Sequence, residues 1–110
     1  MLVGCKRAYI DADFNLGETF RPEECVSIPQ MVQALTEGGY YSIGIADRAG
    51  KLLEGMDADL VVLSDNILEF DDAYKLLDVA VEMTVSEGDI VFEGPLTLRE
   101  GLEKSGVLLV

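Results

Sequence analysis

The side chains of this 110-residue chain that could do chemistry are carboxylates and two cysteines, because the sequence contains no histidine. Asp11, Asp13 and Asn15 occupy the first, third and fifth positions of a calcium-binding loop pattern. The pattern then fails, since Leu16 stands where glycine is needed and Pro22 where a bidentate glutamate is needed. The segment therefore has two interpretations, a calcium site or a solvated acidic loop, and the two missing residues favour the loop.

The two cysteines, Cys5 and Cys25, are the candidate nucleophiles. Lys6 and Arg7 follow Cys5 directly and would lower the pKa of its thiol, because nearby positive charge favours thiolate. The chain offers no histidine as a base, so we expect a packed helix cysteine rather than a catalytic one. The spacing of the pair fits neither CxxC nor a zinc ribbon and suits a reducing compartment, where a disulfide between them would be the exception.

The composition is that of an acidic globular chain. With 49% apolar residues and three prolines it should form at most one folded domain. Its net charge of -13 and pI of about 4.1 argue against nucleic acid and anionic membranes as partners, because only eight residues are Lys or Arg. It has no apolar run near the ~20 residues needed to span a bilayer, and its N-terminal charge order is the reverse of a signal peptide. We therefore expect a cytoplasmic protein.

A capping-box pattern marks the start of the clearest predicted helix. The Ser27 hydroxyl can accept the backbone N–H of Gln30, and the Gln30 side chain can reach back to the N–H of Ser27. Apolar residues then recur at helical spacing and form one stripe: Ile28, Met31, Val32 and Leu35. We predict a helix over residues 28–37, ended by Gly38 and Gly39.

The segments on either side of this helix are expected to be short helices and a loop. Residues 1–9 are predicted to form a short helix, or the end of one, and the polar residues 11–24 a surface loop. Residues 40–45 are predicted to form a second, shorter helix. Tyr40 and Tyr41 at its start could line a pocket, or could divide between core and surface.

The second half of the chain changes from helical to strand periodicity. Leu60–Leu63 is a continuous aliphatic run, which predicts a strand covered on both faces. Val79–Val85 alternates apolar and polar residues, and the turn Glu87-Gly88 leads into an antiparallel partner strand at Ile90–Phe92. The remaining expected elements are a short helix from Asp71-Asp72 to Leu77, a helix from Leu98 to Lys104, and an apolar terminus, Val107–Val110.

Two segments of the chain resemble a known family. They are PEECVSIPQMVQALTEGGYYSIGIADRAGKLLEGMDADLVVLSD (residues 22–65) and VAVEMTVSEGDIVFEG (residues 79–94). They resemble the C-terminal end of the metal-dependent amidohydrolase superfamily, most of all the branch named amidohydrolase 3. The family pattern Gly-x-x-x-x-Gly-x-x-Ala-Asp, which precedes an aliphatic strand, is matched here by Gly50, Gly55, Ala58 and Asp59.

The resemblance extends over about residues 1–94 and has two departures. GCKRA, residues 4–8, is similar to the helix that follows the eighth barrel strand. The family usually has Asn at the position of Gly39 and a basic residue at or near Met56. These differences tell against close functional kinship but not against the fold.

The resemblance implies an α+β fold, with short N-terminal helices followed by a small antiparallel or mixed sheet. Residues 1–46 would be a helical segment similar to the last barrel helices, and residues 47–94 would supply strands of the composite β-sandwich. Residues 95–110 would form a C-terminal tail with a short helix.

The family motif has a structural interpretation in this arrangement. Gly55 permits the turn, Ala58 is small enough for close packing, and Asp59 accepts backbone amide hydrogen bonds at the strand entrance. A role for Asp59 as metal ligand or base is the functional alternative. An acid that flanks a buried strand is usually an anchor, which favours the structural interpretation.

The resemblance also implies a function for a parent enzyme. Family members hydrolyse C–N bonds other than peptide bonds with zinc or another divalent metal held by histidines, a Lys or carboxylate, and an Asp. This chain lacks histidine, so we expect no cofactor in it and no catalytic or metal-binding residue. It is interpreted as the C-terminal fragment of such a hydrolase, inactive alone.

A stand-alone oligomerisation or protein-binding module is the alternative function. In the family the C-terminal strands pair with N-terminal strands, which these residues do not include. Uncovered strand edges and apolar faces would then lie in water. We therefore expect a homo-oligomer joined through the strands or through helix 28–37.

Overall fold

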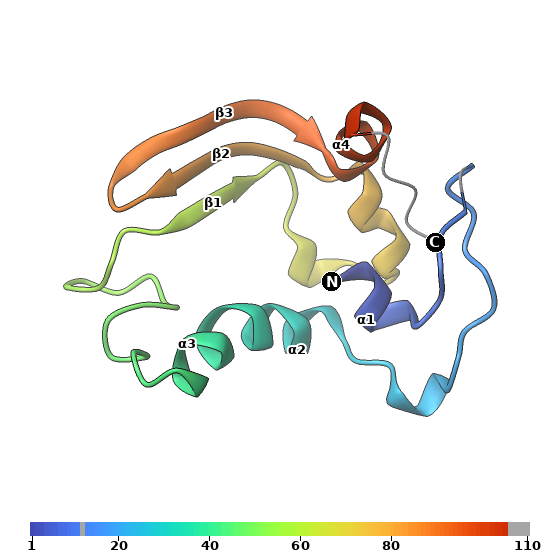
Figure 1. The fold of residues 1–110 in the computed structure, drawn as a ribbon, viewed down its shortest axis with the longest axis horizontal. Helices are drawn as coiled ribbons and strands as arrows, with labels where there is room; N and C mark the ends of the chain where they lie inside the picture. Colours follow the sequence, from blue (N-terminus) through green and yellow to red (C-terminus); the bar gives the residue numbers. More distant parts are fainter. Residues whose placement is uncertain (12, 106–110) are drawn as a thin grey trace.

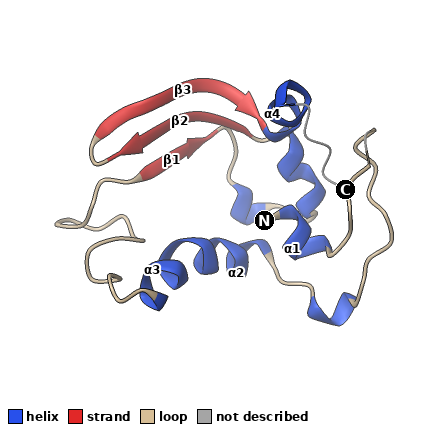
Figure 2. Ribbon diagram, viewed as in Figure 1, coloured by secondary structure: helices blue, strands red, loops and turns tan. Residues whose placement is uncertain are grey.

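The fold is an open sheet above a group of short helices. A computed structural model describes residues 1–11 and 13–105. Its three strands form one antiparallel sheet in the order β1-β2-β3, which is the upper layer in Figure 1, and the helices lie below the sheet and at one end of it. Figure 2 shows the same separation of strands from helices. The predicted α+β class is confirmed, while the predicted apolar terminus at residues 107–110 lies outside the described residues.

The elements follow one another as predicted, with shifted bounds. The helical elements, in which η marks a 3-10 or π turn, are α1 (Leu2–Lys6), η1 (Pro22–Glu24), α2 (Ile28–Gln33), η2 (Ala34–Gly38), α3 (Gly39–Ser42), η3 (Ile67–Glu69), η4 (Ala73–Asp78) and α4 (Leu98–Ser105). The strands are β1 (Leu60–Leu63), β2 (Ala80–Ser86) and β3 (Asp89–Thr97). Thus β1 has the predicted bounds, whereas β3 continues beyond its predicted end at Phe92.

The helical run from α2 to α3 begins at a capping box and passes through a π turn. The Gln30 N–H donates to the Ser27 hydroxyl at 3.3 Å, and the Ser27 N–H donates to Oε1 of Gln30 at 2.9 Å. The prediction that Gly38 and Gly39 end the helix is wrong, because both have helical dihedral angles and η2 continues into α3. Glycine permits a left-handed helix end but does not require one. The run ends after Ser42, where Gly44 takes a φ of +79°.

The sheet is built around the hairpin of β2 and β3. Its turn residues Glu87 and Gly88 have φ values of +51° and +86°, as a two-residue hairpin turn requires. Within residues 1–11 and 13–105, strand β1 pairs only with β2 and forms one edge of the sheet. Val61 and Val62 are 52% and 40% exposed, so the prediction that this strand is covered on both faces is wrong for the described chain. The aliphatic run forms a strand without the second layer that its composition suggested.

The core is small and lies where the helices meet the end of the sheet. Ile10, Ile28, Ala73 and Leu77 form its buried cluster, and Leu77 is fully buried. Element η4 is central, because both α1 and α4 pack against it. The Cα radius of gyration is 15.3 Å, against about 13 Å for a compact domain of this length. Nowhere in the described residues is a helix long and apolar enough to cross a membrane.

Candidate functional site

Gly50 lies where the chain, after leaving α3, passes back alongside η2 and α3. A Cβ added at Gly50 would lie 2.9 Å from Cδ2 of Tyr40 and 3.1 Å from Cα of Glu37. Its φ of +95° is also one that other residues rarely adopt. Lys51 then pairs with Glu37 at 2.7 Å. Tyr40 is thus half-buried beside Gly50, whereas the Tyr41 side chain is 77% exposed. Of the two tyrosines, one therefore packs inside the fold and the other lies on the surface.

The segment between Gly50 and the first strand is a closed loop. The Asp57 N–H donates to the Arg48 carbonyl at 2.8 Å, and Nε of Arg48 donates to Oδ2 of Asp57 at 3.3 Å. Gly55 lies within this loop, two residues before Asp57, with a φ of +89°, and a Cβ added there would meet open space. Gly55 is therefore needed for its backbone angle, and Gly50 for its angle and its close packing.

Asp59 connects the loop to the β2–β3 hairpin. Its Oδ1 atom accepts the N–H of Glu87 at 2.8 Å, and the carbonyl of Ala58 accepts the N–H of Gly88 at 3.0 Å. The Ala58 side chain is exposed rather than closely packed. The carboxylate of Asp59 thus satisfies a backbone amide of a turn whose two residues have positive φ. This geometry is that of an anchor at the entrance to β1.

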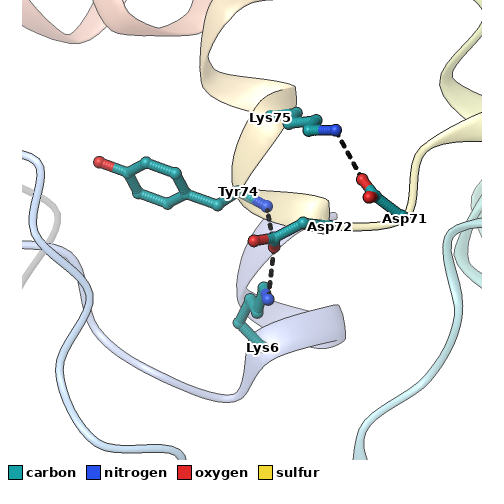
Figure 3. A network of polar contacts seen from close by, with 5 residues as sticks. All are labelled: Lys6, Asp71, Asp72, Tyr74 and Lys75. Atoms are coloured by element: carbon teal, nitrogen blue, oxygen red, sulfur yellow. Dashed lines mark hydrogen bonds and ion pairs between the residues drawn. The ribbon is translucent and has the colours of Figure 1, made fainter.

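A group of charged side chains joins α1 to the start of η4, as Figure 3 shows. Lys6 Nζ pairs with Oδ1 of Asp72 at 2.5 Å, and the same carboxylate accepts the N–H of Tyr74 at 3.0 Å. The Lys6 ammonium, followed by that N–H, lowers the pKa of Asp72. Lys75 donates to Asp71 at 2.6 Å, which lowers the pKa of Asp71 and raises that of Lys75. Asp72 therefore both caps η4 and holds α1.

The acidic loop is held to the helical core through Phe14. The Tyr74 hydroxyl donates to the Phe14 carbonyl, and the Arg99 guanidinium lies 4.6 Å from the centre of the Phe14 ring. Arg99 also donates to Asp78 at 3.0 Å, and this bond raises the pKa of Arg99. These contacts link the loop at Phe14 to η4 and to α4, three segments that are distant in sequence. They account for Tyr74 and Arg99 as structural residues.

The Asp11 carboxylate is occupied by its own loop. It accepts the N–H groups of Asp13 at 2.9 Å and Asn15 at 2.8 Å, and the Asn15 N–H is the main cause of its lowered pKa. Across residues 1–11 and 13–105, no three side chains of His, Cys, Asp or Glu come together as metal ligands. The donor set described here does not fit the divalent metal that the family resemblance implies.

The environment of Cys5 differs from the one expected. Burial raises the pKa of the Cys5 thiol, and this effect exceeds the opposing influence of the N-terminal ammonium and of Lys6. The predicted lowering of this pKa is therefore wrong. The reason is that α1 packs Cys5 against the core, while Lys6 pairs with Asp72 and Arg7 with Glu24.

Comparison with known proteins decides the family. The family described as "Amidohydrolase family" matches residues 4–92, which is most of the chain. The chain belongs to the amidohydrolase family. A curated relative, "Putative amidohydrolase YtcJ" of Bacillus subtilis (strain 168), is 34% identical over 77 residues. That match covers 70% of this chain and 14% of the relative, so the chain spans a small part of the protein it resembles. No solved structure matches.

The amidohydrolase match begins within α1 and ends in the first half of β3, so the Gly50–Asp59 motif lies well inside it. In the structure these motif residues shape a loop and anchor a turn. None of the described contacts places Asp59 with other carboxylates as a metal site. The motif residues of this amidohydrolase segment therefore shape the Arg48–Asp57 loop and anchor the β2–β3 turn.

Sequence reasoning missed the long-range polar contacts of this amidohydrolase segment. The pairs Lys6–Asp72 and Tyr74–Phe14 join residues about sixty positions apart, for which a single sequence gives no local signal. Asp72 had a partial signal in the sequence, because a short helix was expected to begin at Asp71-Asp72. The Arg48–Asp57 pair is only nine residues apart. Gly50 and Gly55 lie between its two members and suggest turns that could bring the chain back on itself.

Proposed function

We propose that this chain is the C-terminal scaffold segment of an amidohydrolase that acts on C–N bonds other than peptide bonds. In this proposal the zinc or other divalent metal is held by a barrel outside these 110 residues, and the chain alone does not hydrolyse substrate. The observation that carries the proposal is the family match over residues 4–92 in a chain with no histidine. A family member of this kind needs ligands that these residues cannot supply.

The contacts of the motif support a scaffold role. Gly50 brings the segment against the helical run, and Asp59 holds the β2–β3 turn, so the motif links both layers of the fold. Such links set the position of elements and do not require a reacting atom. In a longer protein they would hold the helices beside the barrel and the strands within the composite sheet.

A test of this proposal uses the coding region upstream of Met1. We expect it to encode a barrel with histidine pairs that purifies as one active enzyme together with these residues. In that enzyme, Asp59→Ala should lower thermal stability and leave kcat/KM for N-acyl amino acids unchanged. Replacing a barrel histidine should abolish turnover. A selective loss of kcat in Asp59→Ala, with stability unchanged, would show that Asp59 takes part in catalysis and would contradict the proposal.

A second candidate function is self-association. Among the described residues, one edge of strand β1 has no partner strand, and its valines Val61 and Val62 are exposed. Leu35 in η2 is 59% exposed. Exposed strand edges and apolar side chains favour pairing with another chain. In this case the partner is a second copy that continues the sheet or covers the helix.

Sedimentation of the purified chain at micromolar concentration tests self-association. We expect a dimer or larger species, and we expect Val61→Lys to dissociate it because a charge would lie at the pairing edge. Leu52→Lys, at an exposed loop position, adds the same charge elsewhere and should leave the assembly intact. A well-folded monomer for the unmodified chain would exclude self-association, and dissociation by both substitutions would exclude the edge of β1 as the specific pairing surface.

A further inference from the structure

The two cysteines of the chain are brought to neighbouring elements by the fold. Cys5 lies in α1, and Cys25 directly follows η1, where its N–H donates to the Pro22 carbonyl at 3.1 Å. Both thiols are unbridged and half-buried. Figure 1 shows α1 beside the segment that leads from η1 into α2.

Contacts of Arg7 connect the end of α1 to the segment around η1, just before Cys25. Arg7, two residues after Cys5, pairs through Nη2 with Oε2 of Glu24 at 3.1 Å. Arg7 also exchanges two hydrogen bonds with the Phe20 backbone: the Phe20 N–H donates to the Arg7 carbonyl at 2.8 Å, and Nε of Arg7 donates to the Phe20 carbonyl at 2.9 Å. The residue immediately before Cys25 is thus tied to the end of α1.

Contacts on the other side bring α1 against α2. A Cβ at Gly4, the residue before Cys5, would lie only 2.9 Å from Sδ and Cε of Met31. The two helices therefore touch at Gly4, and Cys5 lies between this contact and the Arg7–Glu24 pair. After the dominant effect of burial, the nearby Cys25 thiol also raises the pKa of Cys5. The Arg7–Glu24 pair and the Gly4–Met31 contact thus hold together the two segments that carry the cysteines.

We propose that Cys5 and Cys25 form a reversible disulfide and are a thiol modification site for small-molecule disulfides such as oxidised glutathione. A disulfide requires two cysteines that the fold brings close together, and the contacts above hold together the segments that carry Cys5 and Cys25. The inference is independent of the proposed hydrolase segment, because it concerns a pair of thiols that the family motif does not include. Its effect would be to fix α1 to the segment that precedes α2.

The reaction is thiol–disulfide exchange in two steps. A Cys25 thiolate attacks one sulfur of oxidised glutathione, so that a mixed disulfide forms and one glutathione thiolate leaves. The Cys5 thiolate then attacks the Cys25 sulfur, the internal disulfide forms, and the second glutathione thiolate leaves. In total the two cysteine thiols lose two electrons and two protons, and one oxidised glutathione becomes two reduced glutathione molecules.

The test is an equilibrium titration of the complete 110-residue chain in anaerobic glutathione buffers, with acid quenching and mass spectrometry. We expect a product lighter by two hydrogens, formed intramolecularly. The effective concentration of its thiols should be at least about tenfold higher in the folded chain than in urea, since the fold then favours the bond. Equal or lower values in the folded chain, or glutathione adducts alone, would overturn the proposal. This comparison requires no variant to fold.

Two variants test whether the fold selects the pair Cys5 and Cys25. Cys5→Ser should stop at a single glutathione adduct on Cys25. The double variant Cys25→Ser/Ser86→Cys keeps two thiols but moves one to the exposed end of β2, which Figure 1 places at the opposite end of the sheet from α1. We expect only glutathione adducts from this double variant, with far-UV circular dichroism matching the parent chain. An internal disulfide in it would show that the fold does not select the natural pair.

Discussion

Replacing Gly50 by alanine should destabilise the fold more than the same replacement at Gly55. Both glycines have nearly the same backbone angle, with φ of +95° and +89°. They differ in surroundings, because a Cβ at Gly50 would lie 2.9 Å from the Tyr40 ring and 3.1 Å from Cα of Glu37, whereas Gly55 has open space. The pair of substitutions therefore separates backbone strain from the close approach of two segments.

The structure sets the expected size of each effect. Forcing alanine into a positive φ costs about 1–3 kcal/mol at either position. Gly50→Ala adds an overpacking cost of about 1–3 kcal/mol, because Cα of Glu37 belongs to the helix backbone and cannot turn aside as a side chain can. The expected difference between the two variants is about 2 kcal/mol, or roughly 8 °C in Tm for a chain of this size.

Urea unfolding followed by circular dichroism measures this difference. We expect lower midpoints for both variants with an unchanged slope, and the lower midpoint for Gly50→Ala. Equal midpoints would refute the argument that the segment after the helical run packs against that run. A milder effect at Gly50 than at Gly55 would refute it as well.

Three further predictions concern stability. Asp59→Ala should lower the free energy of unfolding by about 0.5–1.5 kcal/mol, because the Glu87 N–H loses its acceptor, and an unchanged urea midpoint would contradict this. The pKa values of Asp71 and Asp72 are lowered in the folded chain, so their stabilising effect is present above about pH 4 and is lost as pH falls through the lowered values. Urea midpoints measured from neutral to acid pH should show this fall, and Asp72→Asn should make it shallower. Formation of the proposed disulfide closes a loop of about 20 residues and should add about 3 kcal/mol, so unfolding in matched oxidised and reduced buffers should show a higher midpoint for the oxidised chain.

Local signals in the sequence predicted the elements well. The Ser27–Gln30 pair marks the start of α2, and the aliphatic run Leu60–Leu63 gives the bounds of β1. Both signals depend on neighbouring residues alone. The helix end was missed because Gly38 and Gly39 are compatible with helical and left-handed angles alike, and only the later course of the chain decides between them.

Tertiary packing was harder to predict than local structure. The aliphatic composition of β1 suggested a layer on each face, yet exposure of Val61 and Val62 depends on what other segments supply. The pKa of Cys5 was predicted from its charged neighbours, whereas burial against the core dominates. Lys6 could not be assigned to Asp72 from the sequence, because no periodicity links residues so far apart.

Metal content and hydrolysis measured on the isolated chain test whether these 110 residues can hold zinc and cleave an amide without the barrel. The chain is purified from zinc-supplemented medium, dialysed, analysed for metal, and incubated with N-acyl amino acids. We expect zinc well below one equivalent per chain and product formation no faster than in the protein-free control. One tightly held zinc per chain, or amide hydrolysis by the chain unaided, would contradict this expectation.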